Sequence, residues 1–398
     1  MFLLLALALP LLSAAAPLPP DGLPTPYPQP PKAQRTTFTL YVPSVQKNAV
    51  FFTGPTVSFG YGWGVYNWRW FRPNEVQNYG PTSFNWVKMT DNPGNATAEL
   101  CDAKRIPHNV LLRLNKAEAG VSPQAVGDDA YTWAVSMEDA PGVGKCVEAF
   151  EIGNEPNLSG PGLYNGPVDP EAYADQLCAA HDAIKGVDPS FIVVSGGLAP
   201  TTSLFPDETI VMDEEAFLRR MLTRIGDTHA GDAGACFDIL AYHNYGFRTG
   251  HLTEPSDDPY DPDCPDGMCF RGVERIQTIL WIEFGVPKKI WATEVGWLRD
   301  FNVEGCLARN PGVFGNFVGF ENTDQEQADE LVGAFQYARA NWQWVGAMFV
   351  FNLDFNQREW WKNDHCIDEQ GWFAVQGLSD YEHTYAAKAA LEALEKLP

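Results

Sequence analysis

The chain has 398 residues and a formal net charge of −24 at pH 7. This length fits one large α/β barrel or two ordinary domains. The negative charge argues against nucleic acid and anionic membranes as partners, because their phosphates would be repelled. Among smaller ligands it favours a neutral one over a polyanion.

The N-terminus predicts an exported protein. Residues 2–16 form an apolar run that ends in Ala14-Ala15-Ala16. The run is too short to span a bilayer and ends in small residues, so we expect a signal peptide over residues 1–16 and a secreted protein that leaves the membrane after cleavage. A retained membrane anchor is the alternative. Residues 17–35 contain eight prolines and predict an extended or disordered linker.

From residue 36 to residue 398, short apolar runs alternate with helical stretches, which is the pattern of a parallel α/β fold. The predicted strands are Val57–Gly62, Trp86–Met89, Val110–Leu114, Ala149–Gly153, Phe191–Ser195, Ile239–His243, Lys289–Thr293 and Ala347–Asn352. Eight strands with intervening helices predict a single (β/α)8 TIM barrel. An open doubly wound sheet is the alternative, but no glycine-rich phosphate loop follows the first strand.

Capping residues mark several helix ends. Asp169-Pro170-Glu171 combines a capping aspartate, a proline for the first turn and an acid that faces the helix dipole. Thr323-Asp324-Gln325-Glu326 is a capping box. Gly285 and Pro287 end the helix before the seventh strand, and a last helix is expected over roughly Glu382–Lys396.

The eight cysteines all follow the signal-like segment, and an even number in a secreted chain favours disulfides. Cys264 and Cys269 flank a loop sequence that a disulfide could staple; buried free thiols are the alternative. The chain has no C-x-x-C pair and only seven histidines. We therefore expect no zinc site. We also expect no other metal and no cofactor.

Two apolar runs end on a glutamate. Glu155 lies in Phe150-Glu151-Ile152-Gly153-Asn154-Glu155-Pro156, and Glu294 lies in Trp291-Ala292-Thr293-Glu294-Val295-Gly296-Trp297. A barrel presents catalytic groups at the carboxyl ends of its strands, and a pair of carboxylates is what glycosidic bond cleavage requires. Their separation of 139 residues leaves room for the two intermediate strands. A turn after a strand is the plain alternative for each motif alone.

These motifs resemble glycoside hydrolase clan A, a superfamily of retaining (β/α)8-barrel glycosidases, and look closest to family 39-like members. The resemblance implies that Glu155 is the acid/base on the fourth strand and Glu294 the nucleophile on the seventh. It also implies that Asn154, before the acid, binds the sugar 2-hydroxyl.

The sixth strand strengthens the resemblance. His243 and Tyr245 lie two residues apart in Ala241-Tyr242-His243-Asn244-Tyr245 and so face the same side of a strand. Clan members carry a His and a Tyr here. By this resemblance Tyr245 would hold Glu294 through its hydroxyl and His243 would line the sugar subsite. A core histidine and a packing tyrosine are the alternative.

Two basic residues compete for a place beneath the nucleophile. Arg113 interrupts the apolar third strand, and a charge inside a barrel strand needs a partner. The clan commonly has an arginine in this role, often on the second strand, where this chain has Lys88. Either side chain could instead pair with a loop acid.

Tryptophans gather after predicted strands: Trp63, Trp68, Trp70, Trp297, Trp360 and Trp361. Trp297 is the best candidate for stacking on a sugar ring, with core packing as the alternative. Many clan members have a Trp at the end of the eighth strand. Here Val350-Phe351-Asn352-Leu353 has none, which is a departure in the sugar subsite.

Asn95-Ala96-Thr97 and Asn157-Leu158-Ser159 match the N-glycosylation sequon. The second lies within the motif that carries Glu155, where a glycan would obstruct the site.

Taken together, the sequence predicts a secreted, monomeric, retaining glycoside hydrolase that degrades a β-linked neutral polysaccharide. Three long predicted loops, 246–270, 298–322 and 353–380, favour endo cleavage in a groove. An exo-acting β-glycosidase, similar to a β-xylosidase, is the nearest alternative. A non-catalytic carbohydrate-binding barrel is the alternative of another class.

Overall fold

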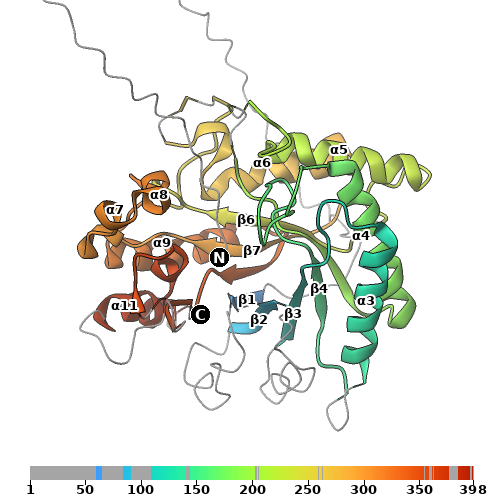
Figure 1. Ribbon diagram of the computed structural model, residues 1–398, viewed down its shortest axis with the longest axis horizontal. Helices are drawn as coiled ribbons and strands as arrows, with labels where there is room; N and C mark the ends of the chain where they lie inside the picture. Colours follow the sequence, from blue (N-terminus) through green and yellow to red (C-terminus); the bar gives the residue numbers. More distant parts are fainter. Residues whose placement is uncertain are drawn as a thin grey trace, which may run out of the picture. The chain divides into compact units, whose positions relative to one another are not determined.

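A computed structural model describes residues 60–64, 84–90, 109–139, 144–201, 204, 206–258, 260–261, 263–353, 355–357, 361, 363–375, 384–394 and 397. Within them, eight parallel strands form one sheet (Figure 1). The strands are β1 (Gly60–Gly64), β2 (Phe84–Thr90), β3 (Asn109–Leu114), β4 (Ala149–Ile152), β5 (Ile192–Ser195), β6 (Leu240–Tyr245), β7 (Ile290–Gly296) and β8 (Val345–Val350). The expected signal peptide and linker, together with Trp68, Trp70, Trp360 and the Asn95 sequon, lie outside the described residues.

The sheet closes on itself. Its order, β5-β4-β3-β2-β1-β8-β7-β6, places the first and last strands side by side, and β1 pairs with both β2 and β8. Isolated parallel bridges, Val194–Ile239 and Leu198–Tyr242, link β5 to β6. The result is a nearly closed (β/α)8 barrel, which confirms the fold predicted from the sequence.

All eight predicted strands are present. The largest difference among the strand ends that can be compared is at β7, which continues past the predicted Thr293 to Gly296. Its pairing with β6 shifts register between Tyr242 and His243, and its pairing with β8 shifts between Ala292 and Val295. This irregularity lets the strand run on while it re-aims the side chain of Glu294.

Glycines on β1 make room for the aromatic filling of the barrel. A Cβ on Gly60 would lie 2.7 Å from the Trp86 ring, and one on Gly62 would lie 2.3 Å from the Phe349 ring. Trp86, Trp291 and Phe349 are fully or almost fully buried and belong to one cluster with the inward residues of the other strands. The lower barrel is therefore a packed core, and the polar side chains lie above it.

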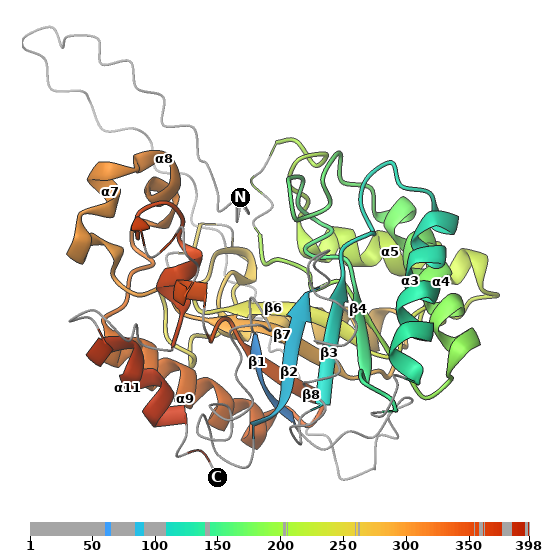
Figure 2. The same ribbon diagram turned by 60° about the horizontal axis from the view of Figure 1, so that its bottom comes forward.

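The helices include those whose starts or ends the sequence predicted. They are α3 (Pro123–Glu138), α4 (Pro170–Val187), α5 (Glu214–Thr228), α6 (Val273–Thr278) with a π-helical turn (Ile279–Glu283), α7 (Cys306–Arg309), α8 (Pro311–Phe314), α9 (Asp324–Asn341) and α11 (Thr384–Leu394). Short 3₁₀ turns occupy Pro265–Gly267, Phe270–Gly272, Phe301–Glu304, Gly315–Phe317, Phe355–Gln357 and Gln370–Phe373. Helices α3, α4 and α5 lie beside one another, and α9 packs with α11 (Figure 2).

Local capping explains where these helices begin and end. The Asp169 side chain accepts a hydrogen bond from Ala172 N–H at 2.9 Å, and both hydrogen bonds of the Thr323–Glu326 capping box are present, as predicted. The helical segment before β7 ends at Glu283, and Gly285 adopts φ 67°. Among the helices that the structure describes, none is both long and apolar enough to cross a bilayer.

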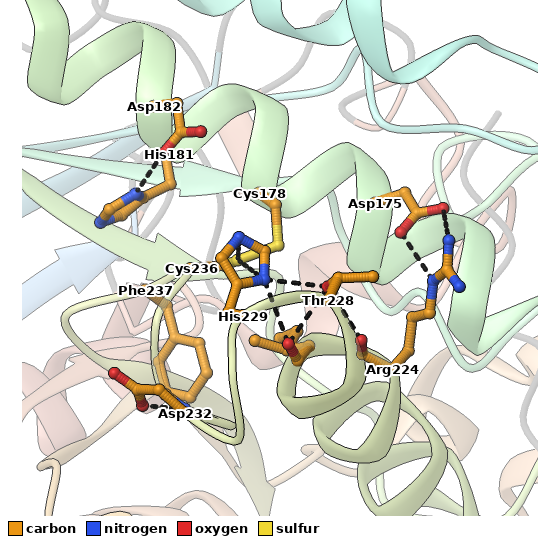
Figure 3. The surroundings of a disulfide bond; sticks show 12 residues. Asp175, Cys178, His181, Asp182, Arg224, Thr228, His229, Asp232, Cys236 and Phe237 are labelled. Carbon is orange, nitrogen blue, oxygen red and sulfur yellow. Dashed lines mark hydrogen bonds and ion pairs between the residues drawn. A yellow bond between two sulfur atoms is a disulfide. The ribbon is translucent and has the colours of Figure 1, made fainter.

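Two of the disulfides described here join elements that are distant in sequence, and a third closes a local loop. Cys178 on α4 is bonded to Cys236 beyond α5, Cys264 to Cys269, and Cys306 to Cys366; Cys146 is also disulfide-bonded. The loop staple predicted for Cys264 and Cys269 is thus confirmed. His229 lies beside the first of these bonds, with Nε2 3.6 Å from the Cys236 sulfur (Figure 3).

Two of the long loops share a second hydrophobic core, which we call the cap. Its buried members are Tyr245, Leu298, Phe301, Cys306, Phe314, Phe317, Phe320, Phe351, Trp361, Cys366, Trp372 and Phe373. The Cys306–Cys366 disulfide ties the loop after β7 to the loop after β8. Both loops follow strands, so the cap stands at the carboxyl-terminal face of the barrel.

Glu214 anchors the loop after β5 to helix α5. Its buried carboxyl group accepts hydrogen bonds from the Thr201 backbone N–H at 2.8 Å and hydroxyl at 2.9 Å, and faces the Tyr242 hydroxyl at 3.3 Å. Burial, together with nearby Asp213, raises the pKa of Glu214 to about 8, against the lowering effect of the Thr201 hydrogen bonds. The folded protein therefore keeps this group protonated at pH values where the unfolded chain has ionised it.

This difference predicts the sign of a pH effect on stability. Between the ordinary pKa of 4.5 and about 8, the folded state binds the Glu214 proton and the unfolded state does not, so its contribution is complete below pH 4.5 and is lost as pH rises toward 8. Glu214→Gln should reduce this decline in unfolding free energy by about 1.4 kcal/mol per pH unit. Urea unfolding of both proteins from pH 5 to pH 8 measures it. The exposed Glu138→Gln is the control, and parallel curves for wild type and Glu214→Gln would contradict the assignment.

Candidate active site

A strained turn after β4 presents Glu155 to the barrel axis. Gly153 has φ 82°, a conformation that favours glycine, and Glu155 itself has φ 43°. The Glu155 N–H donates to Gly197 O at 3.0 Å, and its carbonyl accepts from Leu158 N–H at 2.9 Å. The surrounding loops hold a backbone conformation that glutamate rarely adopts, which is typical of functional sites.

Glu155 and Glu294 meet at the mouth of the barrel. Their exposed fractions are 2% and 5%. A carboxylate oxygen of each and a ring nitrogen of His243 all lie within 4.8 Å of one another. His243 Nδ1 is 2.8 Å from Glu155 Oε1 and 3.5 Å from Glu294 Oε2. The structure therefore brings together three residues that the sequence predicted for one site.

Both candidate cations lie beside Glu294. Lys88 Nζ is 3.4 Å and Arg113 Nη1 is 3.6 Å from Glu294 Oε1. The sequence left the two as competitors, whereas the structure places both within ion-pair distance. Arg113 Nη1 also donates to Asn154 Oδ1 at 2.6 Å. Asn154 in turn donates to Gly162 O at 3.1 Å, so its amide is oriented at the site.

Tyr245 connects Glu294 to the cap. Its hydroxyl donates a hydrogen bond to Glu294 Oε2. Its ring packs edge-on against Phe351 and Phe373, with centroids 5.8 Å and 5.5 Å away. Burial, the Glu294 charge and the hydrogen bond to it keep the pKa of Tyr245 far above its usual value, so this group remains a donor.

His243 is a neutral spacer between the two carboxyl groups. Its ring is completely buried, and a Cβ on Gly197 would lie 2.3 Å from Nε2. Burial lowers the pKa of His243 below 6.5, although its hydrogen bond to Glu155 and the charges of Glu155 and Glu151 oppose this. Neutral imidazole can exchange a hydrogen bond with Glu155 without adding a third cation.

Glu151 is a site residue that the sequence reasoning missed. It is fully buried on β4, and its Oε2 lies 2.8 Å from Lys88 Nζ. Burial alone would raise the pKa of Glu151, but the charges of Lys88 and Arg113 and the hydrogen bond from Lys88 outweigh it and hold the pKa below its ordinary value. The sequence did contain an indication of this role. Glu151 is a charge inside the apolar run Ala-Phe-Glu-Ile, and it needs a partner for the same reason as Arg113.

Trp297 requires a correction. Its side chain is completely buried, its ring packs 5.6 Å from the Phe270 ring, and its Nε1–H donates to Thr249 O at 2.9 Å. A ring enclosed in this way has no face for a sugar, so Trp297 packs the core. Trp63 and Trp361 are buried as well. The sequence alone could not distinguish these roles, because both use an aromatic residue after a strand.

The sequon at Asn157 is also internal. Asn157 is completely buried, donates to Ala199 O at 2.9 Å and Met212 O at 3.1 Å, and accepts from Ala199 N–H at 3.0 Å. Its amide joins two loops, and the folded protein offers it no space for a glycan.

Two groups of side chains bring metal-binding atoms together among the described residues. In the first, Glu155, His243 and Glu294, the nearby charges of Lys88 and Arg113 oppose a bound cation. In the second, Cys178, His229 and Cys236, both sulfur atoms belong to one disulfide. Neither arrangement is suited to a resident metal.

Comparisons with known proteins find similarity at the level of the fold. No family model and no curated protein matches the chain. Among solved structures, it resembles a glucosidase from Croceicoccus marinus (14% identity, TM-score 0.49), covering 78% of this chain and 61% of that chain. It also resembles fungal β-1,4-galactanases (12% identity, TM-score 0.48), covering 84% of this chain and 99% of that chain. A third similar structure is a GH53 catalytic domain from Ignisphaera aggregans (15% identity, TM-score 0.46), with 75% of this chain and 88% of that chain covered. These are distant barrel similarities, so the case for an activity rests on the side chains.

The buried charges predict a large effect of removing Lys88. Lys88→Met leaves Glu151 buried without its 2.8 Å partner, and breaking a buried pair costs about 3–5 kcal/mol. The double variant Lys88→Met/Glu151→Gln removes both charges and should recover most of the loss. Urea unfolding at pH 7 measures each variant. Lys145→Met, which breaks a more exposed pair with Asp188, is the control. Single and double variants of equal stability would contradict this reading.

Proposed function

We propose that this protein is a retaining glycoside hydrolase that cleaves β-linked neutral glycans by double displacement. The observation that carries the proposal is the pair Glu155 and Glu294, with carboxylate oxygens within 4.8 Å at the carboxyl ends of β4 and β7. Retaining enzymes hold their carboxyl groups about 5–5.5 Å apart, whereas inverting enzymes need about 6.5–9.5 Å to admit a water molecule.

The contacts of each carboxyl group support its role. Glu294 is faced by Lys88, Arg113 and the Tyr245 hydroxyl, which together stabilise a negative charge. Glu155 instead contacts neutral His243, so it is the better place for a proton. Two carboxyl groups in unequal surroundings are the arrangement that acid and nucleophile require.

The reaction follows from these positions. Glu294 attacks the anomeric carbon while Glu155 donates its proton to the departing glycosidic oxygen. A glycosyl ester on Glu294 results, and Glu155 is left as a carboxylate. Glu155 then removes a proton from water, which attacks the anomeric carbon and releases Glu294. In this mechanism Asn154, whose amide is held by Arg113 and Gly162, would bind the sugar 2-hydroxyl.

The cap supports endo cleavage of a polymer. Its shared core and the Cys306–Cys366 disulfide stabilise two loops that can form one wall of a groove. An exo-acting β-glycosidase, in which the same loops close a pocket, and a carbohydrate-binding barrel without catalysis are the alternatives. The signal-like N-terminus and the disulfides support secretion.

The proposal predicts the anomer of the first product. Purified protein should hydrolyse at least one substrate among β-glucans, mannans, xylans and aryl β-glycosides, and ¹H NMR should show the β-anomer before mutarotation. An α-anomer would contradict the retaining mechanism. Carbohydrate binding by calorimetry without hydrolysis of any substrate would favour the binding barrel instead.

Azide should separate the two roles. Glu294→Gly should lose at least about 10⁴-fold in kcat, and azide should replace the missing nucleophile to give an α-glycosyl azide. Glu155→Ala should still form the glycosyl ester from an aryl glycoside with a good leaving group, and azide should trap it as a β-glycosyl azide. Mass spectrometry and NMR identify the products. The opposite pattern would exchange the assignments of the two glutamates.

A further inference from the structure

The proposed mechanism leaves the buried charge of Glu151 without a chemical step. Its carboxylate is held on β4, four residues before Glu155, and is completely buried. Burying an ionised carboxylate is costly, and one paired cation rarely makes it favourable. A charge kept at the mouth of the barrel in spite of this cost calls for a role in the site.

Glu151 and Glu294 share a single ammonium group. Lys88 Nζ is 2.8 Å from Glu151 Oε2 and 3.4 Å from Glu294 Oε1. The closer partner of Lys88 is thus the carboxylate that does not react. Glu151 draws the lysine away from Glu294 and also adds a negative charge to the surroundings of Glu294 and His243.

Charged and titratable groups face Glu151 from several elements. Lys88 on β2 and Arg113 on β3 lower the pKa of Glu151 by their charges, and the neutral ring of His243 on β6 also lies near it. Tyr173 on α4 is near enough for the Glu151 charge to contribute to its raised pKa. The Tyr173 hydroxyl is occupied, since it donates to Ile152 O at 2.9 Å and accepts from Gly196 N–H at 2.6 Å. Lys88, which lies within ion-pair distance of both Glu151 and Glu294, is therefore the group through which Glu151 acts on Glu294.

We infer that Glu151 is a positioning residue, which shares Lys88 with Glu294 and thereby sets the pH range in which the catalytic pair works. This inference rests on the proposed function. The Glu151 charge makes it harder for both Glu294 and Glu155 to lose a proton, because like charges repel. It moves the active range toward higher pH, and it keeps Lys88 from binding the nucleophile too tightly.

The direction of the effect can be measured. Glu151→Gln keeps the size of the side chain and removes its charge, so Lys88 turns fully to Glu294. The acidic limb of the kcat/KM profile should move to lower pH by about one unit, with the basic limb moving the same way. Activity at the new optimum should stay within about tenfold of wild type. The measurement uses the 4-nitrophenyl β-glycoside that wild type hydrolyses best.

Matched variants distinguish charge from packing. Glu148→Gln, on the same chain segment and bonded to Val110 N–H at 2.7 Å, should leave the profile in place. Glu151→Asp keeps the charge and should stay close to the wild-type profile. If Glu151→Gln does not fold, Glu151→Asp and Glu151→Asn give the same comparison, with the acidic shift in the Asn variant alone. A folded Gln or Asn variant with an unmoved profile, or one moved to higher pH, would overturn the inference.

A second measurement separates this inference from the proposed function. Glutamate labelled with ¹³C at the carboxyl carbon allows Glu294 to be titrated by NMR in wild type and Glu151→Gln, with Glu294→Gln used to assign the signal. The Glu294 midpoint should fall by about one pH unit in the Glu151 variant whether or not any glycoside is cleaved. An unchanged midpoint would overturn the role of Glu151, whereas a shifted midpoint in a protein that cleaves no β-glycoside would overturn the proposed function alone.

Discussion

The site depends on balancing negative charge in a place that water hardly reaches. Glu151, Glu155 and Glu294 share the barrel mouth, and none is more than 5% exposed. Lys88 and Arg113 are the cations that face them. Three buried carboxylates would repel one another strongly, but two can be matched by two cations. This constraint favours one protonated carboxyl group, and in the proposed mechanism that group is Glu155, which contacts a neutral imidazole.

The scaffold reaches this arrangement through local irregularities rather than ideal strands. The register shift in β7 aims Glu294 toward the axis opposite His243, its pairing partner on β6. The left-handed turn at Gly153 and Glu155 swings the second carboxylate toward the first. Tyr245 then fixes the position of Glu294. Its ring packs on Phe351 and Phe373 in the cap, and its hydroxyl donates a hydrogen bond to the Glu294 carboxylate. Regular strands alone would bring Glu155 and Glu294 to the mouth of the barrel without directing their carboxyl groups toward each other.

The sequence predicted the barrel, and the residues that it assigned to the centre of the site lie together in the structure, because both follow from short-range patterns. Apolar runs ending in Glu155 and Glu294 indicate strands and their carboxyl ends, and Arg113 was suspicious as a charge in an apolar strand. The role of Trp297 could not be predicted, because burial depends on Phe270 and on a loop carbonyl that only the fold brings near. Glu151 is likewise a charge inside an apolar strand, but it was overlooked because attention went to the Asn154-Glu155-Pro156 motif that follows it. The sharing of Lys88 could not be predicted either, because its two partners lie on β4 and β7 and come together only in the tertiary structure.

Stability gives little reason for this protein to keep Lys88 and Glu151. A buried ion pair replaced by apolar side chains of similar size is often neutral or stabilising, because the charges no longer need to leave water. The barrel interior directly below, filled by Trp86, Trp291 and Phe349, shows that this fold packs fully buried apolar groups well. The pair is therefore better explained by what lies above it. With Lys88 alone, Glu294 would face a full, unshared cation; with neither Lys88 nor Glu151, Arg113 and Tyr245 would be left to stabilise its charge. The shared lysine gives an intermediate electrostatic field, which suits the role proposed for Glu294, a carboxylate that stays ionised and still attacks carbon.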